Sequence, residues 1–340
     1  MRHLAGNTGS RQSPRHAGTN CVDRTVLVLS DQTWKSGSIP LRFQIGDFRL
    51  GKVMLPLLRR SAALDEPPLD PGNIPETPPE LGGALGYVVW SQPLVRRLPA
   101  VTPRCDAIRY VPRQYRRFSI ELSGGFDQYM ATFSGRTRSG LKRKLRKFAD
   151  ASIGSVDFRQ YRTPAEIECF FTLARKVSSK TYQERRLKLG FPVHPEFFAA
   201  GIALSKQDCI RGYILFLAGK PISYLYCTVR RDVVSYDHHG FDPAFARLSP
   251  GTVLQLLALQ TLFAEQRFST FDFTPGEGFH KERFATEGRL CGDVFVIKWR
   301  VLPILLILLH RAVDRTSQAV GSILDRVNLK SVLRRRLRGA

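Results

Sequence analysis

The sequence predicts an α/β (α+β) protein built on a mixed β-sheet that is flanked by helices. Three strand-like segments, residues 210–217, 222–229 and 233–238, follow one another with links of only four and three residues. Links this short make consecutive strands antiparallel neighbours. A helical segment at 249–266 then leads to a short buried strand at 270–273. A helix between two strands of one sheet is typical of a β-α-β crossover.

Strands are also predicted on either side of this region. Residues 41–60 alternate between apolar and polar side chains and contain Gly46-Asp47, which indicates two strands joined by a turn. The segment 64–83 is rich in proline, glycine and acids, so we expect a surface loop there. Further strands are predicted at 86–94, 117–122 and 293–300.

Four more helices are predicted outside the central crossover. The clearest start is Thr163-Pro164-Ala165-Glu166, because threonine can cap a helix, proline suits its first turn and glutamate complements its dipole. A basic cluster lies on the first of the four helices and on the turn that leads into it. The four helices cover residues 126–148, 164–187, 195–205 and 278–284.

The charge of the chain indicates an anionic partner. The 340 residues include 52 Lys and Arg against 29 Asp and Glu, a formal charge of +23. Hydrophobic residues make up 43%, which supports a globular core and excludes a wholly disordered chain, a collagen-like fibre and a polytopic membrane protein. Most of the excess charge lies in three segments, 1–24, 136–147 and 311–340, which carry +3, +7 and +6.

Three further features bound the class of protein. The six cysteines are spread out without metal-ligand spacing, so we expect separate thiols in a reducing compartment and no metal site. Residues 1–24 lack the apolar stretch of a secretory signal and are expected to form a disordered tail. The apolar run 301–309 is shorter than the roughly 20 residues of a bilayer span. It favours a buried helix, with a membrane-surface helix that continues into the C-terminal arginines as the alternative.

The first candidate binding site is the start of the 249–266 helix. A serine can cap this helix, a proline suits its first position, and the glycine that follows lets another group approach the backbone. Three backbone amides would then point out of the helix beside an arginine, which predicts an anion site suited to a pyrophosphate. The same Ser-Pro-Gly is also simply a good helix start. The residues proposed to contact the anion are Arg247, Ser249, Gly251, Thr252 and Val253, with Lys281 further along the chain.

Two acids and two histidines are the candidates for a general base. Asp237, His238 and His239 end the third strand of the meander. Because side chains alternate along a strand, Asp237 and His239 are expected on one face, and Tyr236 and His238 on the other. A base here would lie beside the anion site. Asp272 lies in an aromatic strand, where an acid either holds the turn that follows or takes part in catalysis.

Two motifs in this order carry a family resemblance. GFDPAFARLSPG at 240–251 is followed by FDFTPGEGFHKERF at 271–284, and the basic segment SGRTRSGLKRKLRKF at 134–148 lies upstream. Together they resemble the GNAT-superfamily acyltransferases of the CelD/BcsL type, relatives of the FemAB-like double-GNAT proteins. The usual pyrophosphate loop of that superfamily is richer in glycine, and this chain keeps only Gly251 of it.

The resemblance implies a GNAT-like mixed sheet in two tandem halves. The match covers roughly residues 118–300, and the earlier part of the chain agrees only in general style. The implied organisation is a disordered basic tail, a degenerate N-terminal GNAT-like half, a C-terminal GNAT acyltransferase half and an amphipathic basic C-terminal helix. These parts occupy residues 1–24, 25–150, 151–300 and 301–340.

The resemblance also implies a reaction. An acyl group would pass from acyl-CoA, such as acetyl-CoA, to an amine or hydroxyl of a cell-envelope or polysaccharide-related acceptor by direct attack. In this superfamily the donor's pyrophosphate lies at the start of the helix after the fourth strand, which here is the Arg247 to Val253 segment. The expected partner is a small-molecule or glycan acceptor. The expected location is the cytoplasm, including contact with the anionic inner face of the membrane.

Two other functions stay open from the sequence. An aminoacyl-tRNA donor, as in the FemAB-like relatives, would use the basic segment 136–147 to follow RNA phosphates. That segment lacks the interleaved aromatics that stack on unpaired bases. A non-catalytic protein that retains a GNAT shell would instead bind an anionic membrane through its C-terminal arginines. Nucleic acid is otherwise not an expected partner.

Overall fold

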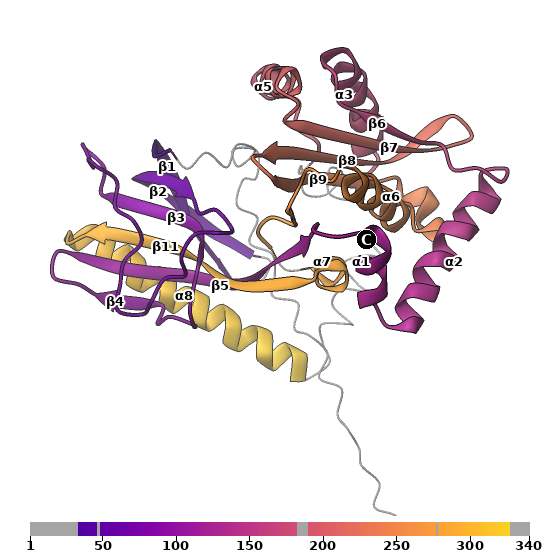
Figure 1. Cartoon of the computed structure of the whole chain (residues 1–340). Helices are drawn as coiled ribbons and strands as arrows, with labels where there is room; N and C mark the ends of the chain where they lie inside the picture. The colour runs from indigo at the N-terminus through magenta and orange to yellow at the C-terminus, as the bar shows by residue number, and fades with distance from the viewer. Residues whose placement is uncertain (1–32, 46–47, 182–189, 277, 327–340) are drawn as a thin grey trace, which may run out of the picture.

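A computed structural model describes residues 33–45, 48–181, 190–276 and 278–326. Within these ranges, eleven strands form one mixed sheet in the order β1-β2-β3-β11-β5-β10-β9-β8-β7-β6, with β4 paired to β5. The predicted mixed sheet flanked by helices is therefore confirmed. Figure 1 shows two lobes that share this sheet, one built on β1 to β5 with β11 and α8, the other on β6 to β9 with the remaining helices. The predicted 1–24 tail and the C-terminal arginines lie outside the described residues.

The first lobe contains longer strands than the sequence indicates. Strands β1 and β2 pair antiparallel, which confirms the predicted strand pair, while its turn at 46–47 lies outside the described residues. Strand β5 begins well before residue 117 because two of its arginines, Arg109 and Arg117, are buried through hydrogen bonds. Arg109, for example, is 1% exposed and donates to the carbonyls of Pro71 and Asn73. The elements are β1 (Lys35–Ile45), β2 (Phe48–Ser61), β3 (Gly86–Pro93), β4 (Val101–Pro103), β5 (Ala107–Glu121), β11 (Glu287–Lys298) and α8 (Val301–Arg326).

The second lobe follows the predicted order closely. The meander is confirmed because β7, β8 and β9 pair antiparallel, and the crossover is confirmed because β10 pairs parallel with β9. A short 3-10 helix, η2, was not predicted. The elements are α1 (Phe126–Thr132), α2 (Gly135–Ala151), β6 (Phe158–Tyr161), α3 (Pro164–Ser178), α5 (Pro195–Lys206), β7 (Ile210–Leu217), β8 (Lys220–Arg230), β9 (Val233–Phe241), η2 (Pro243–Leu248), α6 (Pro250–Glu265), β10 (Thr270–Asp272) and α7 (Phe279–Phe284).

Capping residues decide two helix boundaries. The single helix predicted at 126–148 is wrong, because Ser134 starts a second helix by accepting a hydrogen bond from the amide of Thr137. Thr163 and Glu166 form the expected capping box at the start of α3. That helix ends at Ser178, and residues 182–189 of the longer predicted helix lie outside the described residues.

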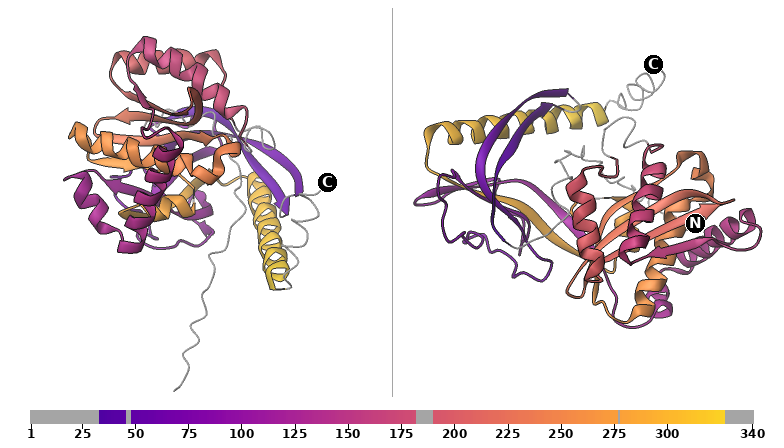
Figure 2. Two further views of the ribbon diagram at one scale, coloured as in Figure 1. Left: turned by 90° about the vertical axis from the view of Figure 1, so that its right-hand side faces the viewer. Right: turned by 90° about the horizontal axis from the view of Figure 1, so that it is seen from above.

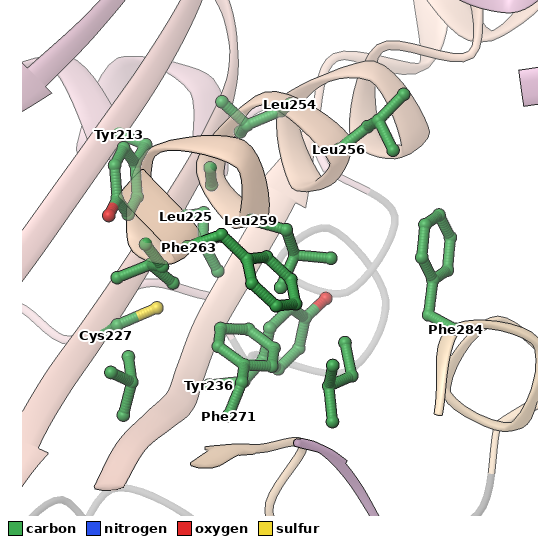
Figure 3. Packing of buried hydrophobic residues seen from close by; sticks show 14 of the residues in the cluster. Tyr213, Leu225, Cys227, Tyr236, Leu254, Leu256, Leu259, Phe263, Phe271 and Phe284 are labelled. Atoms are coloured by element: carbon green, nitrogen blue, oxygen red, sulfur yellow. The ribbon is translucent and has the colours of Figure 1, made fainter. Parts of the chain in front are cut away.

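Helix α6 lies at the centre of the second lobe, as the packing in Figure 3 shows. One side of the helix packs on β7, β8 and β9, and other sides pack on α1 and α2. Leu254 and Leu259 are fully buried, and Phe263 stacks on Tyr129 of α1 at 5.2 Å. Helices α1 and α2 share this core although the predicted division assigns them to residues 25–150. Burial on all sides holds the N-terminus of α6 in one place relative to the sheet.

Helix α8 does not bury the apolar run as expected. Ile307 is fully buried against the first lobe. The Nε2 of His310 donates to the Arg42 carbonyl, and its Nδ1 is hydrogen-bonded to the Tyr110 hydroxyl. Val301 and Leu302, in contrast, are 77% and 68% exposed. The expectation of a buried helix is wrong for these residues, because only one side of α8 meets the sheet, where it lies beside β1 (Figure 2).

Candidate active site

Strands β9 and β10 separate soon after they begin to pair. The parallel ladder joins Thr270–Asp272 to Val233–Ser235, whereas β9 continues to Phe241. In the described parts of the chain, no strand pairs with this edge of β9 beyond Ser235. An unpaired strand edge presents backbone donors and acceptors that an extended ligand can bind.

The turn after β10 produces this opening. Thr274 has a left-handed backbone with φ of 59°, which is uncommon for a residue other than glycine. Its amide donates to Oδ1 of Asp272 at 2.9 Å, and its hydroxyl donates to the Tyr236 carbonyl at 3.0 Å. The first bond bends the chain after Asp272, and the second ties Thr274 to Tyr236 of β9 at the point where the ladder between the two strands ends.

Asp272 is held by a buried ion pair. The guanidinium of Arg117 donates to both of its carboxylate oxygens, and Asp272 is 1% exposed. The structure therefore displays the turn-holding role that the sequence left open for this acid. A catalytic role for Asp272 stays a prediction. For that role its carboxylate would have to accept a proton while it is hydrogen-bonded to Arg117 and to the Thr274 amide.

Asp237 forms a β-bulge in β9. On strand β8, Tyr226 is opposite His238 and Cys227 is opposite Tyr236, so Asp237 is an extra residue without a partner across the ladder. A bulge of this kind shifts the alternation of side chains by one position. The predicted faces of this strand are therefore wrong from Asp237 onward.

The bulge places His239, rather than His238, on the same face of the sheet as Tyr236. The ring of His239 stacks on Tyr236 at 5.6 Å on the α6 side. The ring of His238 contacts Phe191 and Phe197 on the α3 and α5 side. His239, rather than both histidines, is consequently the one beside the start of α6.

The Asp237 carboxylate is suited to proton transfer near neutral pH. Its Oδ2 accepts hydrogen bonds from the Thr228 amide at 2.9 Å and the Thr228 hydroxyl at 2.7 Å. Burial raises the pKa of Asp237 to about 7, against the lowering effect of these two bonds, and the nearby Asp272 adds to the rise. A carboxylate with this pKa can accept a proton from a reacting group at physiological pH.

His239 is a neutral imidazole at the start of α6. Burial, followed by the charge of His280, lowers the pKa of His239 to about 3. Its Nε2 is buried, and none of the described residues forms a hydrogen bond with it. A Cβ atom on Gly251 would lie 2.8 Å from the imidazole Cε1, so only glycine allows α6 to begin this close to the ring.

The start of α6 differs from the predicted anion site. Ser249 adopts a left-handed backbone with φ of 54°, and its side chain does not cap the helix. Its carbonyl accepts hydrogen bonds from the amides of Thr252 and Val253 at 3.0 and 3.1 Å. The expectation of three free amides is therefore wrong. Within the described residues, only the Gly251 amide of the three lacks a backbone acceptor.

Basic residues from α2 and α7 gather where α6 begins. The Nζ of Lys144 lies 3.5 Å from Oγ1 of Thr252, and the Nζ of Lys147 donates to the Arg247 carbonyl at 3.1 Å. Arg283 lies beside Gly140 of α2. Burial lowers the pKa of the Lys144 ammonium, and the neighbouring Arg283 and Arg143 lower it further. We call Lys144, Lys147, Arg247 and Arg283 the cation cluster; the contact of Arg247 with Lys147 is through its backbone carbonyl.

The cation cluster has no acid of its own. None of its four members forms an ion pair with a carboxylate in the described parts of the chain. Like charges held together without counter-charges indicate a site for an anion. The sequence located Arg247 and the basic helix separately, but it did not bring Lys144 and Lys147 to α6, because that contact depends on the packing of α2 against it.

Lys281 has a different set of partners from the one predicted. It is 5% exposed, and its ammonium donates to the carbonyls of Phe273, Thr274 and Pro275 at 2.7 to 3.4 Å. These bonds hold the turn that separates β10 from β9. A contact between Lys281 and a phosphate would require them to break.

The site therefore combines an anion-binding end and a proton-accepting end. The cation cluster and the Gly251 amide form the first. Asp237 forms the second, and its carboxylate is held by Thr228 of β8, on the side of β9 away from β10. The described residues contain no group of three or more His, Cys, Asp or Glu side chains that is placed to hold a metal ion.

Comparison with known families assigns this part of the chain to a class. Residues 135–282 match a family model described as an acetyltransferase (GNAT) domain. The match contains α2, the whole meander, α6 and β10, and with them the residues of the candidate site except Arg283. This part of the chain is thus similar to a GNAT acetyltransferase domain, while the CelD/BcsL type stays a prediction. No curated protein matches the chain.

Solved structures of similar fold are distant in sequence. L-PGS from Bacillus licheniformis is 17% identical, with a TM-score of 0.43 over 68% of this chain and 74% of that one. The C-terminal domain of a putative lysylphosphatidylglycerol synthetase from Agrobacterium fabrum is 12% identical, with a TM-score of 0.43 over 67% and 71%. A structure of FemX is 11% identical, with a TM-score of 0.39 over 57% and 64%.

Proposed function

We propose that this chain is an acyltransferase that moves an acyl group from acyl-CoA to an amine or hydroxyl of a cell-envelope or polysaccharide-related acceptor. One observation carries the proposal: the cation cluster, without acidic partners, lies at the start of α6 beside the open edge of β9. The proposal places the reaction at the cytoplasmic side of the cell.

The donor fits this arrangement by its charge and its shape. A CoA thioester carries phosphates at one end and a chain of amides that leads to the sulfur at the other. Lys144, Lys147 and the Gly251 amide provide donors for the phosphates. The edge of β9 beyond Ser235, with which no strand of the described residues pairs, provides backbone groups for the amides, as an added strand would find them.

The transfer is a direct attack on the thioester. The nitrogen or oxygen of the acceptor forms a bond to the carbonyl carbon, the carbon–sulfur bond breaks, and the CoA sulfur leaves with the electron pair. Asp237 takes the proton that the acceptor loses. Asp237 is preferred over His239 because an imidazole whose pKa is lowered to about 3 is a weak base. It is preferred over Asp272 because that carboxylate is paired with Arg117.

Binding of acetyl-CoA to the full chain tests the proposal. Replacing Lys144 and Lys147 with glutamine removes two phosphate donors and should raise the Kd about 100-fold, since each hydrogen bond to a charged group contributes roughly 1.5–3 kcal/mol. The matched control is Lys142→Gln with Arg146→Gln, which removes the same charge from exposed positions of the same helix. Isothermal titration should find little change in the control.

Two results would overturn the proposal. Acetyl-CoA and longer acyl-CoAs that fail to bind the wild-type protein would exclude a CoA donor. Equal losses in both pairs of variants would show that binding follows overall charge and not the site.

An aminoacyl-tRNA donor is the second candidate, because the basic face of α2 extends beyond the cation cluster. Lys142, Arg143 and Arg146 are exposed and can meet a phosphate backbone. The two substitutions that serve as the control for acetyl-CoA binding become the test for tRNA binding. Lys142→Gln with Arg146→Gln should weaken tRNA binding and lower its salt dependence, while leaving acetyl-CoA binding unchanged. Tight, salt-dependent tRNA binding without acetyl-CoA binding would favour this donor.

A further inference from the structure

Helix α8 presents a continuous apolar stripe to solvent. Its members recur at the three- and four-residue spacing that keeps side chains on one side of a helix. They are Val301, Leu302, Leu305, Leu308 and Leu309, with exposed fractions of 77%, 68%, 58%, 48% and 54%. Isolated exposed leucines are ordinary on a protein surface, whereas a contiguous set of five indicates an interaction site.

The inner side of the same helix is fully used by the fold. Ile307 is buried in the core of the first lobe, and His310 is hydrogen-bonded to Tyr110 and to the Arg42 carbonyl. Figure 1 shows α8 on the outside of this lobe. The helix is therefore held in place by one side, and its apolar stripe faces outward.

The exposed charged side chains that border the apolar stripe are all basic. Lys298, Arg300 and Arg315 are exposed, and Arg311 is half-buried. The only acid between residues 298 and 316 is Asp314. That carboxylate faces inward, where its charge raises the pKa of the Tyr110 hydroxyl, after the larger effect of burial. An apolar stripe bordered by arginines and free of exposed acids matches the surface of an anionic bilayer.

We propose that α8 docks this protein on an anionic membrane surface, with the apolar stripe in the interface and the arginines among the lipid headgroups. None of the helices in the described ranges is long and apolar enough to cross a membrane, so α8 would lie flat. A second copy of the chain fits this surface less well. Two stripes packed against each other would bring the arginines that border them close together, and these like charges repel. This inference concerns where the protein binds and is independent of the reaction it catalyses.

Flotation of the full chain with vesicles tests the docking. Vesicles of phosphatidylglycerol with phosphatidylcholine should carry the wild-type protein, and vesicles of phosphatidylcholine alone should carry much less. Leu305→Gln with Leu309→Gln should lower the partition coefficient about tenfold. Arg311→Gln with Arg315→Gln should lower it about 30-fold on the anionic vesicles alone, because each arginine contributes about a fivefold factor.

The control is Ile153→Gln, which removes an apolar side chain that is 97% exposed in the other lobe. It should bind like the wild type, and thermal unfolding should show that the α8 variants are folded. Leucine variants that float like the wild type would overturn the proposal. So would a wild-type dimer that these variants split, as measured by light scattering, because the stripe would then be an interface between two copies.

Discussion

The two lobes each contain a pair of parallel strands, but only one pair is joined by a helix. In the second lobe, α6 connects β9 to β10 and begins beside the cation cluster. In the first lobe, β2 and β3 are also parallel, yet residues 62–85 connect them without a helix. This connection contains six prolines, which lack the amide that a helix requires. A loop has no aligned backbone amides at its end. The first lobe therefore has a pair of parallel strands like that of the second lobe, but it has no helix that could bind an anion between them.

Two aspartates at β-bulges repeat this contrast at the level of single residues. Asp293 in β11 is buried and accepts hydrogen bonds from the Ser91 amide and the Tyr115 hydroxyl, and Arg113 lies 3.9 Å away. Burial raises its pKa, as it raises that of Asp237. The partners of Asp293 come from β3 and β5, on both sides of its strand, whereas the bonds to Asp237 come from Thr228 alone, and Asp237 is partly exposed. The acid is thus enclosed in one lobe and open to solvent on one side in the other.

Asp237→Asn should produce the largest effect of any single change. An amide cannot take the acceptor's proton, so acyl transfer should fall about 1,000-fold, within the range that a general base contributes. The Kd for acetyl-CoA should change far less than the rate. Release of free CoA thiol from acetyl-CoA with a panel of amine and hydroxyl acceptors measures the rate. Asp293→Asn is the control and should remain active; full activity of Asp237→Asn would assign proton transfer to another group.

Asp293→Ala should change stability instead of activity. The substitution leaves the Ser91 amide and the Tyr115 hydroxyl buried without their acceptor, which should lower the free energy of unfolding by about 3 kcal/mol. Urea unfolding of the variant and the wild type gives this difference. Acetyl-CoA affinity should be unchanged under conditions where the variant is folded. A marked loss of affinity would mean that the first lobe contributes to the donor site.

Gly251→Ala tests the contact between α6 and β9. The added methyl group would lie 2.8 Å from the His239 ring, so the ring or the helix start must move. We expect the Kd for acetyl-CoA to rise about 30-fold, a loss of about 2 kcal/mol. Gly83→Ala, in the loop that connects β2 to β3, has no atom within 4 Å of the new Cβ and should bind normally. If both variants bound acetyl-CoA with equal affinity, the donor would not bind at the start of α6.

The sequence predicts the frame of the second lobe well because its signals are local. Short links determine the meander, and proline and glycine mark the start of α6. The first lobe was harder to predict, since Arg109 and its neighbours make a buried strand look like a solvated segment. Their burial depends on carbonyls more than 30 residues away in the chain, and a single sequence does not show such pairs.

The candidate site was predicted in part. The right strand and the right helix were identified, but two details depended on tertiary structure. The bulge at Asp237 reverses the faces of His238 and His239, and only the pairing with β8 reveals it. The contact between Lys144 and α6 likewise arises from packing between distant segments. Basic residues at regular spacing along α2 were the available signal, and they did not indicate which face meets the site.

The smallest predicted effect is a change of stability with pH, and it again differs between the aspartates of the two lobes. The folded protein holds a proton on Asp237 up to about pH 7, whereas the unfolded chain releases it near pH 4, so the folded state binds more protons between these values. Stability from this group should therefore fall as the pH rises. His239 acts in the opposite direction below about pH 6.5, because its lowered pKa makes the folded state bind fewer protons. Comparing wild type with Asp237→Asn cancels that contribution, since His239 is present in both.

Between about pH 5 and pH 8, the wild type should lose about 1 kcal/mol relative to Asp237→Asn in urea unfolding. A fully buried carboxylate would make the loss of stability larger. The side chain of Asp237 is partly exposed, so water reduces the effect. Bound acetyl-CoA should enlarge the difference if it covers Asp237, because burial of the carboxylate would then be more complete. The difference between wild type and Asp293→Asn, measured in the same way, should not respond to acetyl-CoA. A response there, and none at Asp237, would place the donor in the first lobe and reverse the assignment of the two aspartates.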